Sequence, residues 1–234
     1  MREILKEKLI PLYEELLNGI TLKEKLCTFC VQWGDKFPIE KNEGVLFVGK
    51  APNGWTTTSR NINVLFGDSK SKIFAREDQM EWVHRLEGDV KNNTRTSAFL
   101  RVMKQITKSI SEEGLWYSKI AWSNLYKVSF EKGNPNAKLK KEQLKLCKKI
   151  LESEINILSP KYVIFLSSGW ENEFLYYLNN STSNKSVCKV QWGNNYETKG
   201  YLISGRIYIT SQHPQGKKEK EHIDAILKII KNLN

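Results

Sequence analysis

The chain has 234 residues, 40% of them hydrophobic, and its 37 Lys and Arg against 26 Asp and Glu leave a formal net charge of +11. This length allows one large domain or two small ones, and the charge suits a polyanionic partner such as nucleic acid, unless it only keeps a basic protein in solution. No apolar run approaches the roughly 18 residues of a membrane-spanning helix, and residues 1–10 are too charged for the core of a signal peptide. We therefore expect a cytoplasmic protein without a membrane partner, whose four cysteines do not form disulfides.

Residues 1–40 form a predicted N-terminal segment ahead of the first strand. Leucines and isoleucines recur at helical spacing over residues 2–18, with Lys and Glu between them, and this spacing predicts an amphipathic helix. Cys27 and Cys30 follow, separated by two residues.

The apolar run Val45–Val48, closed by Gly49, predicts a buried strand of an α/β sheet. It leads into the loop Lys50–Gly54, where Pro52 restricts the backbone. Ligands of open parallel sheets bind at the carboxyl ends of strands, so this loop is a candidate binding site; the alternative is an ordinary strand-to-helix turn. The polar segment 56–75 that follows is a second functional candidate.

The rest of the chain alternates between strand and helix patterns. Helices are predicted at 77–89, 97–110, 138–158 and 219–232, and strands at 120–128, 162–166 and 206–210, with a hairpin strand at 187–192 inside an Asn-, Ser- and Gly-rich excursion, 179–200. This alternation predicts a parallel sheet between helices, and we expect one domain over residues 1–234.

Three of the predicted strands lead into polar residues at the same edge of the sheet. Besides the loop after Gly49, Asn124 lies in the second strand and His213 directly follows the fourth. An amide, an imidazole and exposed backbone N–H groups suit recognition of a polar planar ring and stabilisation of an anion on it. The alternative for His213 is a histidine that caps a loop, and structural roles are expected for His84 and His222.

These residues resemble the motifs of the uracil-DNA glycosylase superfamily. Gly49-Lys50-Ala51-Pro52-Asn53 resembles its first motif, a strand followed by G-x-x-P, and His213-Pro214-Gln215 resembles its second, H-P-S, with Gln in place of Ser. Ser123-Asn124-Leu125 resembles the strand asparagine that reads the base, and Val163–Gly169 the strand that ends in Gly. The four matches occur in the family's order, between about residues 27 and 230.

The resemblance implies a three-layer α/β/α fold with a four-stranded, mainly parallel central sheet. It also implies an enzyme that flips a base out of DNA and hydrolyses its N-glycosidic bond. His213 would donate a hydrogen bond to the base O2 and stabilise the leaving anion, while Asn124 would bind the base edge. The backbone around Lys50 and Ala51 would hold the base and the water.

The sequence departs from the family pattern at the water-orienting position. Many members carry an Asp where this chain has Ala51, but one subset has G-x-A-P with a downstream F-x-G-D, and Phe66-Gly67-Asp68 stands at a similar distance. The resemblance to that subset gives Asp68 the role of orienting water or stabilising the sugar cation. The alternative is an Asp that forms a turn after Gly67.

The base pocket is also expected to differ. Uracil-specific members place a Tyr after the motif Pro, whereas this chain has Asn53 and then Gly54, which leaves room at the 5-position of the ring. The pocket would then admit uracil or a larger, 5-modified pyrimidine. Since such bases occur chiefly in viral DNA, defence against phage is an alternative setting to DNA repair.

The cysteines bear on a cofactor found in some members, a four-iron cluster. Cys27, Cys30 and Cys147 match three of its ligand positions, but the third position along the chain holds Val128, and Cys188 lies in the excursion. No cofactor is therefore expected; a cluster or a zinc ion at the three matching cysteines is the alternative to buried thiols.

Basic and aromatic residues around the motifs provide candidates for DNA contact. The phosphate-binding candidates are Arg60, Lys70, Lys72, Lys217, Lys218 and Lys220, while Gln215 is a further substrate contact. Trp55, Phe66 and Trp170 are candidates for stacking on the base, with a core role as the alternative. The lysines of 138–149 are interpreted as the solvated face of their helix.

The sequence thus predicts a monomeric, monofunctional DNA glycosylase for uracil or a modified pyrimidine, with Lys50 as the one candidate for a lyase. Ala51 and Gln215 favour a competing hypothesis, a degenerate module that binds modified or single-stranded DNA without cleaving it. A nucleoside hydrolase is a third hypothesis, against which the charge of +11 argues.

Overall fold

The computed structural model describes residues 1–37, 43–52, 54, 61–67, 80, 83, 93–111, 115–180 and 185–234. Its helices are α1 (Arg2–Gly19), α2 (Ile62–Phe66), α3 (Ala98–Ile110), the 3-10 helix η3 (Trp116–Lys119), α4 (Ala137–Leu158), α5 (Asn172–Leu178) and α6 (Glu219–Leu233). Its strands are β1 (Leu26–Thr28), β2 (Gln32–Trp33), β3 (Glu43–Gly49), β4 (Ile120–Asn124), β5 (Val128–Phe130), β6 (Pro160–Leu166), β7 (Cys188–Trp192), β8 (Tyr196–Ile203) and β9 (Arg206–Ser211).

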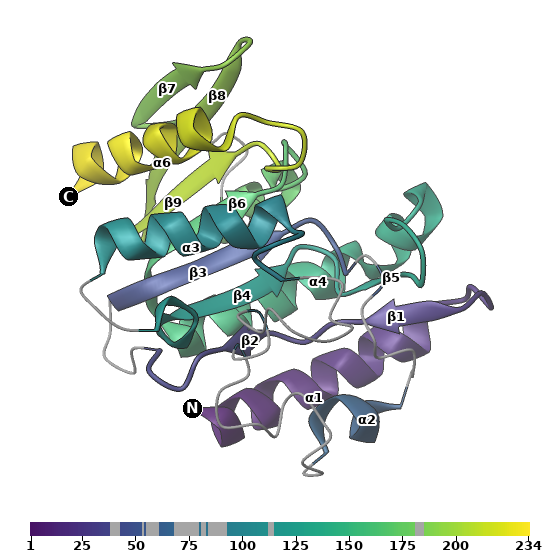
Figure 1. The fold of residues 1–234 in the computed structure, drawn as a ribbon. Helices are drawn as coiled ribbons and strands as arrows, with labels where there is room; N and C mark the ends of the chain where they lie inside the picture. The colour runs from purple at the N-terminus through teal and green to yellow at the C-terminus, as the bar shows by residue number, and fades with distance from the viewer. Residues whose placement is uncertain are drawn as a thin grey trace.

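A mixed sheet of seven strands forms the middle of the molecule, in the order β2-β4-β3-β6-β9-β8-β7 (Figure 1). The neighbours β4, β3, β6 and β9 run parallel, and they are the four strands that the sequence predicts. The predicted total of four strands is wrong, because β2, β8 and β7 extend the sheet with antiparallel pairs at its two edges.

The additional strands have weak sequence signals. β2 is only two residues long. β8 lies largely within the excursion 179–200, whose polar residues obscure the alternation of apolar and polar residues that marks a strand. It pairs with β7 through a turn in which Gly193 and Asn195 have φ angles of 53° and 66°. Both residue types tolerate positive φ, so the composition typical of a loop here marks a hairpin.

The predicted strand over residues 120–128 is in fact two strands. The Leu125 and Tyr126 amides donate to the carbonyls of Gly49 and Lys50, at 2.9 and 3.1 Å, which turns the chain across the end of β3. β5 then pairs with β1 in a separate two-stranded sheet.

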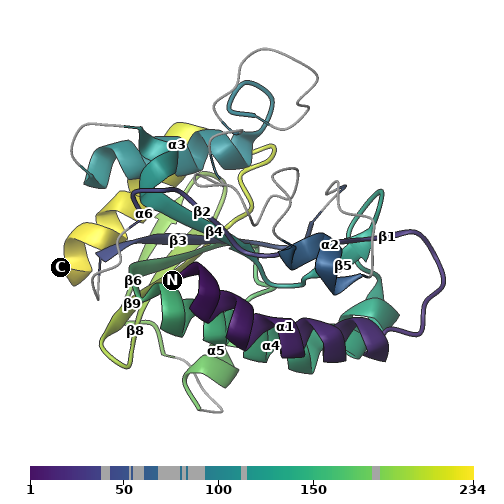
Figure 2. The same cartoon turned by 90° about the horizontal axis from the view of Figure 1, so that it is seen from below.

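Helices cover both faces of the sheet, as the predicted three-layer fold requires (Figure 2). Leu46 and Val48 of β3 pack in the core shared with α1, α4 and α5, whereas Val45 and Phe47 face the core shared with α3 and α6. β3 is therefore apolar on both sides, which explains the continuous apolar run Val45–Val48 in the sequence.

The predicted helices at 2–18, 97–110, 138–158 and 219–232 are confirmed as α1, α3, α4 and α6. Most of the predicted helix 77–89 lies outside the described residues, and the short helices α2 and α5 were not predicted. Among the described helices, none combines the length and the apolar composition needed to cross a membrane.

Candidate functional site

The predicted site lies at the carboxyl ends of the parallel strands, where β3 and β4 finish in register. Gly49 is paired directly with Asn124. A Cβ atom at Gly49 would lie 2.5 Å from the Asn124 Oδ1 and 3.4 Å from the Phe99 ring. Glycine is therefore required at this position for the amide and the ring to approach the end of the strand.

The Asn124 side chain is buried but incompletely bonded. The residue is 2% exposed, and its Nδ2 has no hydrogen-bond partner among the described residues. Leaving a buried amide N–H unpaired costs about 1–3 kcal/mol, so such a group in a folded protein calls for an explanation. A ligand carbonyl placed against this donor would satisfy it.

A buried ion pair supports the backbone of Asn124 from behind. The Lys127 ammonium donates to the Asn124 carbonyl at 2.8 Å, to the Ser123 hydroxyl at 2.6 Å and to the Glu154 carboxylate at 2.8 Å. The Lys127 and Glu154 side chains are both fully buried. Burial raises the pKa of the Glu154 carboxyl, and the nearby Lys127 ammonium opposes that rise.

The loop after β3 is held at its proline. The Pro52 carbonyl accepts hydrogen bonds from the Ser129 hydroxyl and from the Cys27 thiol, the latter at 3.0 Å. Together with the bonds from Leu125 and Tyr126 to the start of the loop, these contacts fix Lys50–Pro52 against β5. The described part of the segment that resembles the first motif is thus anchored by residues far away along the chain.

His213 lies just beyond β9, and we call the edge of the sheet that carries Lys50–Pro52, Asn124 and His213 the rim. Its backbone amide donates to the Ser168 hydroxyl at 2.7 Å, and its ring stacks on Phe99 with centroids 6.0 Å apart. The Gln215 amide donates to the His213 Nδ1 at 3.3 Å. Since Nδ1 accepts a hydrogen bond, the neutral ring carries its proton on Nε2 and presents an N–H donor there.

The surroundings of His213 keep its ring neutral. Burial, followed by the positive charges of Lys50 and Lys217, lowers its pKa from 6.5 to about 4. At neutral pH the ring is therefore a hydrogen-bond donor through Nε2 and carries no charge of its own.

The structure brings some of the other predicted site residues to this rim. Ala51 is half-buried, Pro52 is buried, and Gln215 and Gly54 are exposed, with Gly54 at a φ of 76°. Several predicted residues lie outside the described part of the chain, among them Asn53, Trp55, Arg60 and Asp68. Lys70, Lys72 and His84 also lie outside it.

Phe66 occupies a different environment from the predicted base-stacking position. It is 4% exposed and packs edge-on against Tyr13, with ring centroids 5.3 Å apart. α2 rests on α1, so burying this ring closes the core between the two helices. The structure thus gives Phe66 the core role that was its alternative.

Two of the three phosphate-binding candidates that follow His213 form ion pairs on the surface. Lys218 pairs with Glu221 at 2.9 Å, and Lys220 pairs with Asp224 at 2.7 Å. Lys217 is half-buried, and its ammonium lies 4.9 Å from the centre of the Tyr196 ring. Of the three, Lys217 is the one whose charge acts on His213.

Phe99 and Ser168 belong to the rim but have no signal in the sequence. Phe99 reads as one more apolar residue on the buried face of α3. Ser168 has a φ of 55°, a conformation that its sequence does not reveal. Only the packing of α3 and of the β6–α5 loop brings these residues next to His213.

The cysteines do not come together as a ligand set. Among the described residues, no group of three or more His, Cys, Asp or Glu side chains is placed to hold a metal ion. Burial raises the pKa of both Cys30 and Cys147 to about 12, which disfavours the thiolates that ligation needs. Val128 stands at the position where the cluster-binding members have a cysteine. Its backbone N–H donates to the Gln143 Oε1 at 3.0 Å, and its carbonyl accepts from the Gln143 Nε2 at 2.8 Å.

No protein-family model matches the sequence, and no curated protein matches it significantly. The proposals about function therefore depend on the motifs and on the geometry of the rim.

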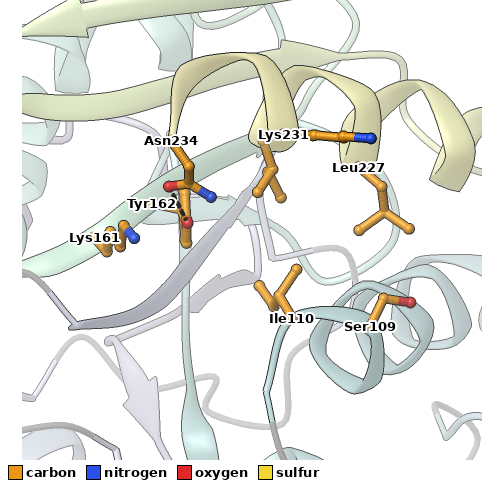
Figure 3. A pocket seen from close by; sticks show the side chains of 8 residues that line it. Ser109, Ile110, Lys161, Tyr162, Leu227, Lys231 and Asn234 are labelled. Atoms are coloured by element: carbon orange, nitrogen blue, oxygen red, sulfur yellow. Dashed lines mark hydrogen bonds between the residues drawn. The ribbon is translucent and has the colours of Figure 1, made fainter.

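A separate hollow of about 500 Å³ lies at the amino end of β6, between the carboxyl ends of α3 and α6 (Figure 3). Ile110 and Leu227 form apolar walls, and Lys161 lies at its side. The Tyr162 hydroxyl already donates to Asn234 at 2.7 Å. The motif residues Gly49, Asn124 and His213 are not among the residues that line this hollow.

Proposed function

We propose that this protein is a monofunctional DNA glycosylase that excises uracil or a 5-modified pyrimidine. One observation carries the proposal: the unpaired Nδ2 of Asn124 and the Nε2–H donor of His213 belong to the same rim, on either side of Gly49 and Phe99. Uracil carries carbonyl oxygens at C2 and C4, and two separate N–H donors suit a base with two such acceptors.

The reaction follows from the roles of these donors. Asn124 binds a carbonyl at the outer edge of the extruded base, and the backbone of Lys50–Pro52 fixes its position. The bond between C1′ of the sugar and N1 of the base breaks, and its electron pair passes to the base, where negative charge develops on O2. The His213 Nε2–H bonds this oxygen, and the positive charges of Lys50 and Lys217 favour the anion.

Water completes the reaction by adding to C1′ and losing a proton, which leaves an abasic site and the free base. By resemblance, Asp68 orients that water. A neutral donor suits the leaving base, because His213 need not transfer a full proton to a weakly basic anion.

The departure from the second motif does not disturb His213. The Gln215 contact to Nδ1 comes from its backbone amide, so the side chain at that position is not needed for it. This contact favours the enzyme over the binding module that Gln215 otherwise suggests. Lys50 holds its ammonium 5.2 Å from the centre of the Trp170 ring, a placement that supports hydrolysis over a lyase reaction through this lysine.

A base-release assay tests the proposal. The full chain is incubated with single- and double-stranded oligonucleotides that carry uracil, thymine, hypoxanthine, 5-hydroxymethylcytosine or its glucosylated form, and abasic sites are then cleaved with alkali. Release of uracil supports a repair enzyme, while release of only the 5-modified bases supports defence against modified viral DNA. Retained DNA binding without release of any base would contradict the enzyme and favour the binding module.

A further inference from the structure

A second feature of the rim is a tryptophan with two lysines against its ring. Trp170 lies between β6 and α5, and the Lys140 ammonium is 3.3 Å from its ring centre, while the Lys50 ammonium is 5.2 Å from it. The Lys140 ammonium also lies 5.8 Å from the ring centre of Tyr126, which packs edge-on against Trp170. Lys50, Lys140 and Trp170 thus converge from three separate elements, and we call them the Trp170 platform.

The two platform lysines lack ion-pair partners within the described part of the chain. Neither ammonium has a carboxylate within 4.0 Å there, whereas Lys148, two turns further along α4, pairs with Glu173 at 3.0 Å. Contact with an aromatic face stabilises an ammonium group but leaves its charge uncompensated. The platform therefore presents two positive charges close together.

After burial, a neighbouring positive charge acts on each of these lysines. Burial, and then the charge of Lys217, lowers the pKa of Lys50, which is opposed by Glu171. Burial, and then the charge of Lys50, lowers the pKa of Lys140. A bound anion would relieve this repulsion, and a molecule with a charge of +11 has no need to concentrate lysines here for solubility alone.

The platform adjoins the proposed catalytic rim. Lys50 directly follows Gly49, which contacts Phe99 and Asn124, and the charge of Lys50 acts on His213. An anion on the platform would therefore lie beside a base held between Asn124 and His213. In a nucleic acid, the anion next to an extruded base is a phosphodiester of its own strand.

We propose that the Trp170 platform binds the phosphodiester backbone of DNA next to the extruded nucleotide, with Lys140 and Lys50 supplying the charge. This inference rests on the proposed function for the identity of the strand. Trp170 then serves to hold the two ammonium groups over one ring, in place of the base-stacking role expected from the sequence. Lys140, expected to be part of a merely solvated helix face, becomes a DNA contact.

The test measures binding and base release separately. Binding of the full chain to fluorescein-labelled single- and double-stranded oligonucleotides of ordinary bases is followed by anisotropy from 50 to 300 mM salt, for wild type, Lys140→Ala, Lys140→Arg and Lys161→Ala. Lys161 is a matched control, because its ammonium also lies near an aromatic ring, 5.3 Å from the centre of Tyr162, but at the amino end of β6, away from the carboxyl ends of the strands.

Loss of one phosphate contact should reduce the slope of log affinity against log salt by about 0.7 on single strands or about 0.9 on duplex. We expect this reduction and a several-fold loss of affinity for Lys140→Ala, with the slope retained in Lys140→Arg and in Lys161→Ala. Equal slopes for Lys140→Ala and Lys161→Ala, or no binding by the wild type, would overturn the platform. If the wild type releases a base but Lys140→Ala keeps the wild-type salt slope, the platform is wrong and the glycosylase stands. If the slope of Lys140→Ala is reduced but the wild type releases no base, the glycosylase is wrong and the platform stands as a DNA contact.

Discussion

The Lys127 ammonium lies 2.8 Å from the Glu154 carboxylate, with both side chains excluded from solvent, and the same ammonium donates to the backbone carbonyl of Asn124. A charged pair thus stands directly behind the residue proposed to read the base. Pairs of this kind are expensive to break on one side only, since the remaining charge is then buried without a partner.

Lys127→Met should therefore destabilise the fold by about 3–5 kcal/mol, as expected for a broken buried pair. Glu154→Gln should also be strongly destabilising, because the buried Lys127 ammonium then loses its opposite charge even though the amide oxygen can still accept from it. Urea unfolding of both variants measures the loss. A loss below about 1 kcal/mol for Lys127→Met would show that the ion pair does not support the fold.

Gly49→Ala should reduce base excision as much as Asn124→Ala, because the added methyl would lie 2.5 Å from the Asn124 Oδ1 and displace the amide. The two changes remove one function, so the double variant should be no slower than either single variant. Single-turnover rates of the four proteins form the cycle. If the rate loss of the double variant equals the product of the two single losses, the two residues do not share one role.

His213→Ala should slow the chemical step by about 10²–10³-fold, as the loss of one donor to a developing anion does in other enzymes. DNA affinity should change little, since the donor acts mainly in the transition state. Single-turnover excision and anisotropy on the same oligonucleotide separate the two effects. Gln215→Ala is the matched control, because it keeps the backbone amide that bonds Nδ1. If His213→Ala reduces DNA affinity and the single-turnover rate by the same factor, His213 does not act on the leaving base.

His222 should make the fold less stable in acid. The ring is fully buried, bonds the Ser211 hydroxyl at 2.7 Å, and has a pKa lowered from 6.5 to about 4, first by burial and then by His213 and Lys217. Between these two pH values the unfolded chain binds the proton and the folded chain does not. Stability is therefore present above pH 6.5 and is lost as pH falls toward 4, by up to about 3 kcal/mol for this residue.

The contribution of His222 can be separated from that of the carboxyl groups by comparison with His222→Gln. Urea unfolding of both proteins at pH 7.5, 6, 5 and 4.5 should give a steeper loss for the wild type. Parallel curves would mean that His222 titrates alike in the folded and unfolded chains.

Borohydride reduction during turnover on uracil-containing DNA should trap no covalent complex. A lyase would form an imine between a lysine and C1′ of the abasic site, but the ammonium of Lys50 lies over Trp170. The measurement is a gel-shift assay after reduction. A trapped species that disappears in Lys50→Ala would reassign this lysine as a nucleophile.

The amino-acid sequence by itself determined the four parallel strands, the main helices and the order of the polar residues that end the strands. Val45–Val48 and the corresponding runs are apolar on both faces, and the helices carry leucines and isoleucines at regular spacing. These are local signals, because strand and helix periodicity depends on residues that are close along the chain. The expectation that Gly49, Asn124 and His213 share one edge followed from the rule for parallel sheets.

Only the tertiary structure decided which side chains complete the rim. From the sequence, Trp170 and Phe66 are candidates for stacking on the base and Phe99 is an apolar residue of a helix, yet Phe99 stacks on His213, Trp170 meets two lysines, and Phe66 closes the core against Tyr13. Likewise, Lys140 belongs to a run of similar lysines, and its place in the first turns of α4 brings it to Trp170, 30 positions further along the chain. Contacts between residues so far apart in the sequence depend on how the helices pack on the sheet, and the local composition of a segment does not predict them.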